Sequence, residues 1–165
     1  MISEEKIRSC ISDVYSEIIS IRRDIHQHPE LSEHEERTEQ VISTWLTQWG
    51  IPHTTGVAGH GVVGVIQGKA VPQPAPKYEA VTIRADIDAL PIQEAVASDF
   101  ASCNPGVMHA CGHDMHTAML LGTAKILKSL ENEFSGAVKL FFQPSEETIG
   151  GANQMIQAGC MQQPN

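Results

Sequence analysis

The chain has 165 residues, of which 41% are hydrophobic and 19% are charged, and its formal net charge is −9. This length and composition indicate one globular domain with a substantial core and exclude a disordered or fibrous chain. The acidic balance, without a cluster of Lys and Arg, argues against nucleic acid or an anionic membrane as a partner.

Targeting signals are not visible in the sequence. The first residues are polar and lack the apolar centre of a signal peptide, and no run approaches the roughly 20 apolar residues of a membrane span. The four cysteines are scattered without a framework spacing. Reduced thiols and a cytoplasmic location are therefore expected.

Two amphipathic helices are predicted before residue 51. Residues 4–28 carry apolar side chains at steps of three and four, Ser3 can cap the helix, and Pro29 ends it. Residues 38–50 repeat this pattern, with Gly50 as the C-terminal stop. The hydrophobic period then changes to two, which predicts strands.

The first three strands are predicted at 51–55, 61–67 and 80–86, and the third is expected in the centre of the sheet. The Pro-rich segment 70–76 is interpreted as an exposed connection.

Irregular chain is expected over residues 95–110. The remaining predicted elements are a helix at 114–130, a strand at 137–143 and a helix at 150–158. Strands that alternate with helices late in the chain, after closely spaced early strands, predict an α/β domain with a mixed β-sheet flanked by helices.

The most concentrated chemistry lies in residues 108–116, Met-His-Ala-Cys-Gly-His-Asp-Met-His. Thiolate and imidazole both bind Zn²⁺ and similar ions, and a spacing of two lets Cys111 and His113 point the same way from an extended segment. The neighbouring His109 and His116 are candidates for contact with substrate or with a ligand. The pattern favours a metal site over a buried cysteine beside a helix-capping histidine.

Carboxylates follow two of the predicted strands. Glu146 and Glu147 point in different directions, so one can bind metal while the other faces water, although the pair also fits a solvated loop. Asp86 and Asp88 share a face, which suits carboxylates that orient a ligand histidine or, equally, a turn before Pro91. The carboxyl ends of strands are the usual site position in open α/β sheets, so all these groups can meet there.

The other histidines receive no ligand role. His26 and His28 lie at a helix end, where a cationic imidazole is mildly favourable. His34, His53 and His60 are isolated and are interpreted as surface or loop residues.

Four ordered motifs resemble the M20 metallopeptidase family. The nearest branch contains amidohydrolases of N-acyl amino acids, such as hippurate hydrolase, aminoacylase-like enzymes and auxin-conjugate hydrolases. The motifs are Arg-Arg-Asp-Ile-His-Gln-His-Pro-Glu-Leu-Ser at 22–32, Arg-Ala-Asp-Ile-Asp-Ala-Leu-Pro-Ile at 84–92, the segment 108–116 with Leu-Leu-Gly at 120–122, and Phe-Gln-Pro-Ser-Glu-Glu at 142–147 with Gly-Gly-Ala at 150–152.

The resemblance assigns roles to individual residues. Those that match the family's metal ligands are Cys111, His113 and Glu147. Glu146 matches the general base, and Asp88 matches the carboxylate that orients the site. Asp86 falls where sister branches carry a ligand histidine, so its own role stays open, and Ser145 replaces a more usual alanine.

The resemblance also implies an architecture. The family's chain is more than twice as long and carries a smaller dimerisation domain and two further ligand histidines. We therefore expect residues 1–165 to be the N-terminal part of a zinc-peptidase-like catalytic domain, with a homo-oligomer only for the full-length protein.

The implied reaction is hydrolysis of the amide bond of an N-acyl amino acid, a small-molecule substrate. The implied cofactor is a divalent metal, as two ions of Mn, Zn or Co. Glu146 would take a proton from water and pass it to the leaving amine. The rival interpretation is a truncated, catalytically inactive metal-binding or residual structural domain, and we expect little or no amidase activity from the 165-residue chain by itself.

Overall fold

The computed structural model describes residues 2–71, 80–148 and 150–162, and most of the predicted connection at 70–76 lies outside these residues. Within those ranges the elements in chain order are α1 (Glu4–Gln27), α2 (Glu36–Gln48), β1 (His53–Val57), β2 (Gly61–Gln67), β3 (Ala80–Asp86), α3 (His113–Ser129), β4 (Ala137–Gln143) and α4 (Gly151–Gln157). Each predicted element is confirmed with bounds within two residues of the expected ones. The side chain of Ser3 caps α1 by accepting a hydrogen bond from the amide of Lys6.

The strands form a mixed sheet, as expected, in the order β1-β2-β4-β3. Strand β2 is antiparallel to both β1 and β4, whereas β3 runs parallel to β4. The expectation that 80–86 is central was wrong, because β3 is an edge of the described sheet and Val81 is 62% exposed. Apolar alternation reports which face of a strand is covered, but not how many neighbouring strands it has.

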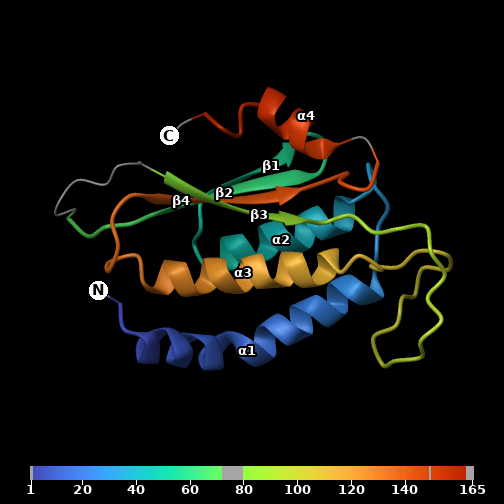
Figure 1. Cartoon of the computed structure of the whole chain (residues 1–165), viewed down its shortest axis with the longest axis horizontal. Coiled ribbons are helices and arrows are strands. Elements are labelled where there is room, and N and C mark those ends of the chain that lie inside the picture. The colour runs from blue at the N-terminus through green and yellow to red at the C-terminus, as the bar shows by residue number, and fades with distance from the viewer. Residues whose placement is uncertain (1, 72–79, 149, 163–165) are drawn as a thin grey trace.

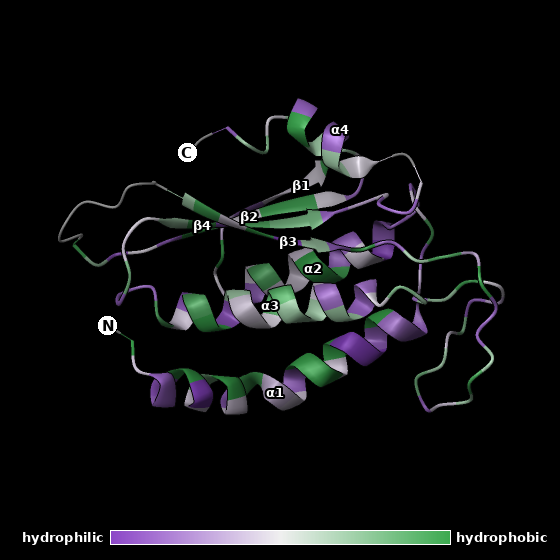
Figure 2. Cartoon of the chain, in the orientation of Figure 1, coloured by the Kyte–Doolittle hydropathy of each residue, from purple (hydrophilic) through white to green (hydrophobic). Residues whose placement is uncertain are grey.

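Three helices cover one face of the sheet and α4 covers the other (Figure 1). Helices α2 and α3 pack directly on the strands, and α1 packs on the outer side of α3. Figure 2 shows mainly hydrophobic residues along β2, which contributes to the core between the sheet and the helices. The largest fully buried side chains in that core include Ile25, Ile42, Leu46, Leu140 and Phe142.

A close approach of α1 to α3 depends on Gly122. A Cβ atom at this position would lie 3.1 Å from Cγ1 of Ile18, which is tighter than ordinary van der Waals contact. Because Gly122 has no side chain, α1 can pack near the axis of α3. The packing also brings the C-terminal turn of α1 beside the first turn of α3.

The parallel pairing of β3 and β4 fixes the position of the candidate site. Asp86 at the end of β3 is in register with Gln143 at the end of β4. The loops that leave these two strands therefore begin side by side, and α3 starts at the same end of the sheet (Figure 1). Among the helices of the described residues, none combines the length and the apolar character needed to cross a membrane.

Candidate metal centre

The structure brings Cys111, His113 and Glu147 together. One potential ligand atom from each residue lies within 4.8 Å of those of the other two. Cys111 is in the turn before α3 and His113 is the first residue of that helix, whereas Glu147 is in the loop after β4. The expectation of an extended segment at Cys111–His113 was wrong. Gly112 has a left-handed φ of +83°, which folds the chain between Cys111 and His113.

The imidazole of His113 is oriented by Asp88. Nδ1 of His113 lies 2.9 Å from the carbonyl oxygen of Asp88 and 3.2 Å from its Oδ1. Both of these atoms are acceptors, so Nδ1 carries the proton and Nε2 keeps the lone pair. Nε2 lies 3.8 Å from Oε1 of Glu147, on the side where a metal ion would bind.

The carboxylate of Asp88 joins three segments of the chain. Its Oδ2 accepts hydrogen bonds from Oγ of Ser32 at 2.7 Å and from the amide of Glu147 at 2.9 Å. Burial by itself raises the pKa of Asp88, but the hydrogen bonds from His113, Glu147 and Ser32 outweigh it and lower the pKa to about 2. Asp88 is therefore a fixed anion that positions His113 and Glu147.

The donor set fits a divalent cation. Oε1 of Glu147 is buried and has no hydrogen-bond partner among the described residues. The neighbouring carboxylate of Glu147 is also the main cause of the raised pKa of the Cys111 thiol. A cation between these residues would satisfy the carboxylate oxygen and favour the thiolate, and a sulfur, a nitrogen and an oxygen donor suit Zn²⁺ and similar ions.

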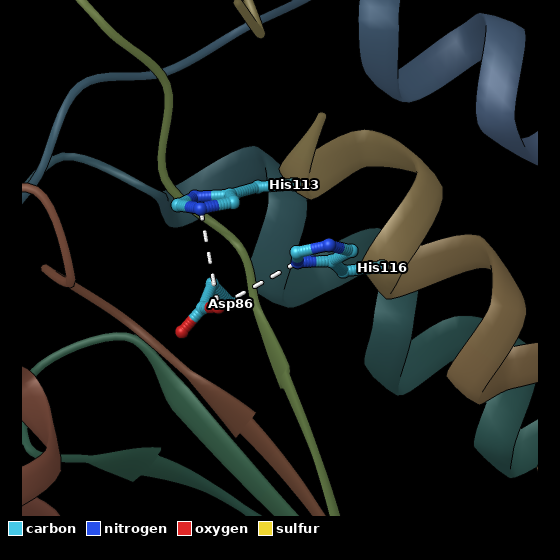
Figure 3. A group of neighbouring side chains, drawn as sticks. All are labelled: Asp86, His113 and His116. Atoms are coloured by element: carbon cyan, nitrogen blue, oxygen red, sulfur yellow. Dashed lines mark ion pairs between the residues drawn. The ribbon is translucent and has the colours of Figure 1, made fainter. Parts of the chain in front are cut away.

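Asp86, His113 and His116 form a second group of potential ligands (Figure 3). Oδ2 of Asp86 lies 3.6 Å from Nδ1 of His116 and 3.9 Å from Nε2 of His113, and Arg84 pairs with the same carboxylate. Because Asp88 occupies Nδ1 of His113, both groups depend on the same nitrogen, Nε2. One lone pair binds one ion, so His113 can complete only one of the two groups at a time.

Glu146 lies in the same loop as Glu147, and its residue is exposed. Its charge contributes to the raised pKa of the Cys111 thiol. The two adjacent glutamates therefore differ in exposure, with Glu147 half-buried against His113 and Glu146 open to solvent.

Sequence reasoning missed a buried charge network behind the first turn of α3. Oδ2 of Asp114 lies 2.7 Å from Nε of Arg22 and 2.8 Å from Nδ1 of His26, and Asp114 is fully buried. His26 Nε2 lies 3.2 Å from Oε1 of Glu94. Asp114 is thus more than an acidic residue at a helix start, and the spacing of four between Arg22 and His26, beside buried Ile25, was the available signal.

His109 is buried as well, at 3% exposure, and neither ring nitrogen has a hydrogen-bond partner among the described residues. Burial lowers the pKa of His109 to about 4, so this imidazole is neutral at physiological pH.

Sequence reasoning also missed Glu35, which holds the loop that carries the two glutamates. Oε1 of Glu35 accepts a hydrogen bond of 2.8 Å from the amide of Ser145, and Oγ of Ser145 accepts one of 3.0 Å from the amide of Glu33. Ser145 has a positive φ of 54°, which a non-glycine residue adopts only when its surroundings hold it there. Glu35 is fully buried, and burial raises the pKa of its carboxyl.

Comparisons with known proteins point to one family. The profile of peptidase family M20/M25/M40 matches residues 82–165. An N-acyl-L-amino acid amidohydrolase of Geobacillus stearothermophilus is 46% identical over 160 residues, which are 96% of this chain and 42% of that protein. An N-acetyl-L-cysteine deacetylase of Bacillus subtilis strain 168 is 40% identical over 158 residues, 96% of this chain and 36% of that protein.

A solved structure points to the same family. The YXEP protein of Bacillus subtilis, named as a dinuclear metal binding peptidase of family M20, matches with a TM-score of 0.83 and 41% identity. The match covers 92% of this chain and 41% of the YXEP chain. This chain therefore spans less than half the length of these relatives. With the family profile on half of its residues and the same fold as YXEP, the chain belongs to peptidase family M20/M25/M40.

Proposed function

We propose that this chain is part of a metal-dependent hydrolase that cleaves the amide bond of N-acyl amino acids. The observation that carries the proposal is the convergence of Cys111, His113 and Glu147 on one point, with Asp88 holding His113 in the metal-binding tautomer. The names of the similar proteins from Geobacillus stearothermophilus and Bacillus subtilis support the substrate class.

Cys111, His113 and Glu147 would hold the divalent ion, for which Mn, Zn and Co all remain candidates. When bound, such an ion polarises the amide carbonyl and makes water more acidic. We propose two ions in the whole protein, supported by the dinuclear description of YXEP. Because His113 offers a single nitrogen, Cys111 or residues other than Cys111, His113 and Glu147 would have to help hold the second ion.

Glu146 is proposed as the general base. Its carboxylate is open to solvent and next in the chain to Glu147, so it can accept a proton from the attacking water and deliver it to the leaving amine nitrogen. Asp88 is proposed as a positioning residue, because its oxygens are fully engaged with His113, Ser32 and the amide of Glu147.

We further propose that residues 1–165 form the N-terminal part of the catalytic domain of a longer protein, supported by the share of each relative that the chain covers. The four cysteines are free, which supports a reducing, cytoplasmic setting. The alternative function is a metal-binding or structural domain without catalysis.

Incubation with N-acetyl and N-benzoyl amino acids tests the proposal. The 165-residue chain and the whole protein are each loaded with Mn²⁺, Zn²⁺ or Co²⁺, and the released amino acid is measured. We expect hydrolysis by the whole protein and little or none by the chain. Metal binding by both, without turnover by either, would favour the non-catalytic alternative.

A further inference from the structure

A pocket of about 410 Å³ opens beside Glu147. Its lining includes the apolar residues Leu31, Ala89, Leu90 and Pro91, together with Glu147 and its neighbour Thr148. This volume is within the range of pockets that bind small molecules. The pocket is separate from the donor atoms of Cys111 and His113, but it shares Glu147 with them.

Backbone pairing holds the apolar walls in place. Leu31 and Ala89 form a parallel bridge, and Leu90 and Met108 form an antiparallel one. The amides of Leu90 and Met108 donate to each other's carbonyl oxygens, each at 3.0 Å. The pocket is thus formed before any ligand arrives, which reduces the entropy cost of binding.

Asp88 fixes the position of the pocket relative to Cys111, His113 and Glu147, which together are called the donor group below. The same oxygen of this residue accepts hydrogen bonds from Ser32, which lines the pocket, and from the amide of Glu147. A molecule whose polar end binds at the donor group therefore has an apolar pocket next to that end, on the Glu147 side.

We propose that this pocket binds the apolar acyl group of the substrate, an inference that rests on the proposed amidohydrolase function. The lining includes Glu147 but neither Lys nor Arg, and its single basic group is the exposed His34. The amino acid half of an N-acyl amino acid carries an α-carboxylate beside its side chain, and no Lys or Arg in this lining could pair with it. The acyl half carries no charge, and it gains free energy when it is buried against Leu31, Leu90 and Pro91.

Acyl hydroxamates test this proposal without turnover. A hydroxamate chelates a bound metal ion and carries a variable acyl chain in the position of the substrate's acyl group. The dissociation constants of acetohydroxamate, butyrohydroxamate and hexanohydroxamate are measured by calorimetry with the Zn²⁺-loaded chain. We expect about fourfold tighter binding for each methylene that enters the pocket.

Filling the pocket gives the decisive comparison. Leu90→Trp should bring the ratio of the acetyl and hexanoyl dissociation constants to about one, and Thr148→Trp provides a second, exposed position for the same test. Ile92→Trp is the matched control, since Ile92 is exposed and is not part of the lining, and it should keep the ratio of the unaltered chain.

The outcomes separate this inference from the function on which it rests. Binding of acetohydroxamate with no effect of chain length would overturn the pocket assignment alone, as would filled variants that keep the ratio. Failure of the chain to bind Zn²⁺ would overturn the metal centre and the pocket together, whereas Zn²⁺ binding without binding of any hydroxamate would overturn the pocket assignment alone.

Discussion

His113 and Asp88 are joined twice, through contacts of His113 Nδ1 with the carbonyl oxygen of Asp88 at 2.9 Å and with its Oδ1 at 3.2 Å. This pairing decides which nitrogen of His113 is free. It also connects the loop after β3 to the first residue of α3, so the two segments cannot move independently without breaking it. The donor group depends on Asp88 even though Asp88 is not one of its ligands.

Asp88→Asn should weaken Zn²⁺ binding by about 10- to 100-fold, because the amide can no longer accept from His113 as a charged group. Competition with a chromophoric chelator measures the affinity. Asp99→Asn, at an exposed loop position, is the control and should leave the affinity unchanged. An Asp88→Asn chain that folds and binds Zn²⁺ as tightly as the original would contradict the positioning role.

The two adjacent glutamates should respond differently to the same substitution. In the whole protein, Glu146→Gln should lower kcat by about 10²-fold or more while the metal content stays the same, because only the proton acceptor is lost. Glu147→Gln should instead lower the ratio of bound metal to protein. Parallel kinetics and metal analysis check both, and the reverse pattern would mean that the two roles are exchanged.

The raised pKa of Glu35 predicts an unusual dependence of stability on pH. Its pKa is raised in the folded state, chiefly by burial, with the charge of Asp88 acting in the same direction and that of His60 opposing it. The folded chain therefore keeps this proton to higher pH than the unfolded chain does. Stability from this group falls as pH rises above the unfolded value of 4.5, and ionised Glu35 costs free energy at neutral pH.

Glu35→Gln should accordingly raise the Tm near neutral pH, by about 2–4 °C for each kcal/mol recovered, and the gain should shrink toward about pH 4. The neutral amide still offers an oxygen to the amide of Ser145. Thermal unfolding followed by circular dichroism over this pH range measures the effect. Glu33→Gln, an exposed neighbour, is the control, and equal behaviour of the two variants would refute the argument.

Asp114→Ala should destabilise the fold by about 2–4 kcal/mol, because it leaves Arg22 and His26 without their buried anion. The expected loss of stability is smaller than for a fully buried ion pair, because the side chain of Arg22 is 25% exposed. Urea unfolding measures the change, with Asp13→Ala on the exposed side of α1 as the control. A loss below about 1 kcal/mol would show that the network contributes little.

The order and type of the elements follow from local patterns in the sequence. Steps of three and four mark α1 and α2, a period of two marks β2, and Pro29 and Gly50 end the helices where short-range sterics require. The ligand candidates were visible for the same reason, since the residue types of Cys111 and His113 and their spacing are local properties.

Tertiary structure decided what those patterns leave open. The edge position of β3 depends on pairing with β4, which lies some 50 residues away in the chain, and no local period encodes the choice of partner. The network of Asp114 with Arg22 and His26 arises because α1 packs on α3 across Gly122. Glu35 and Asp88 acquire their roles in the same way, because the free energy of a buried carboxylate depends on which distant donors the fold brings to it.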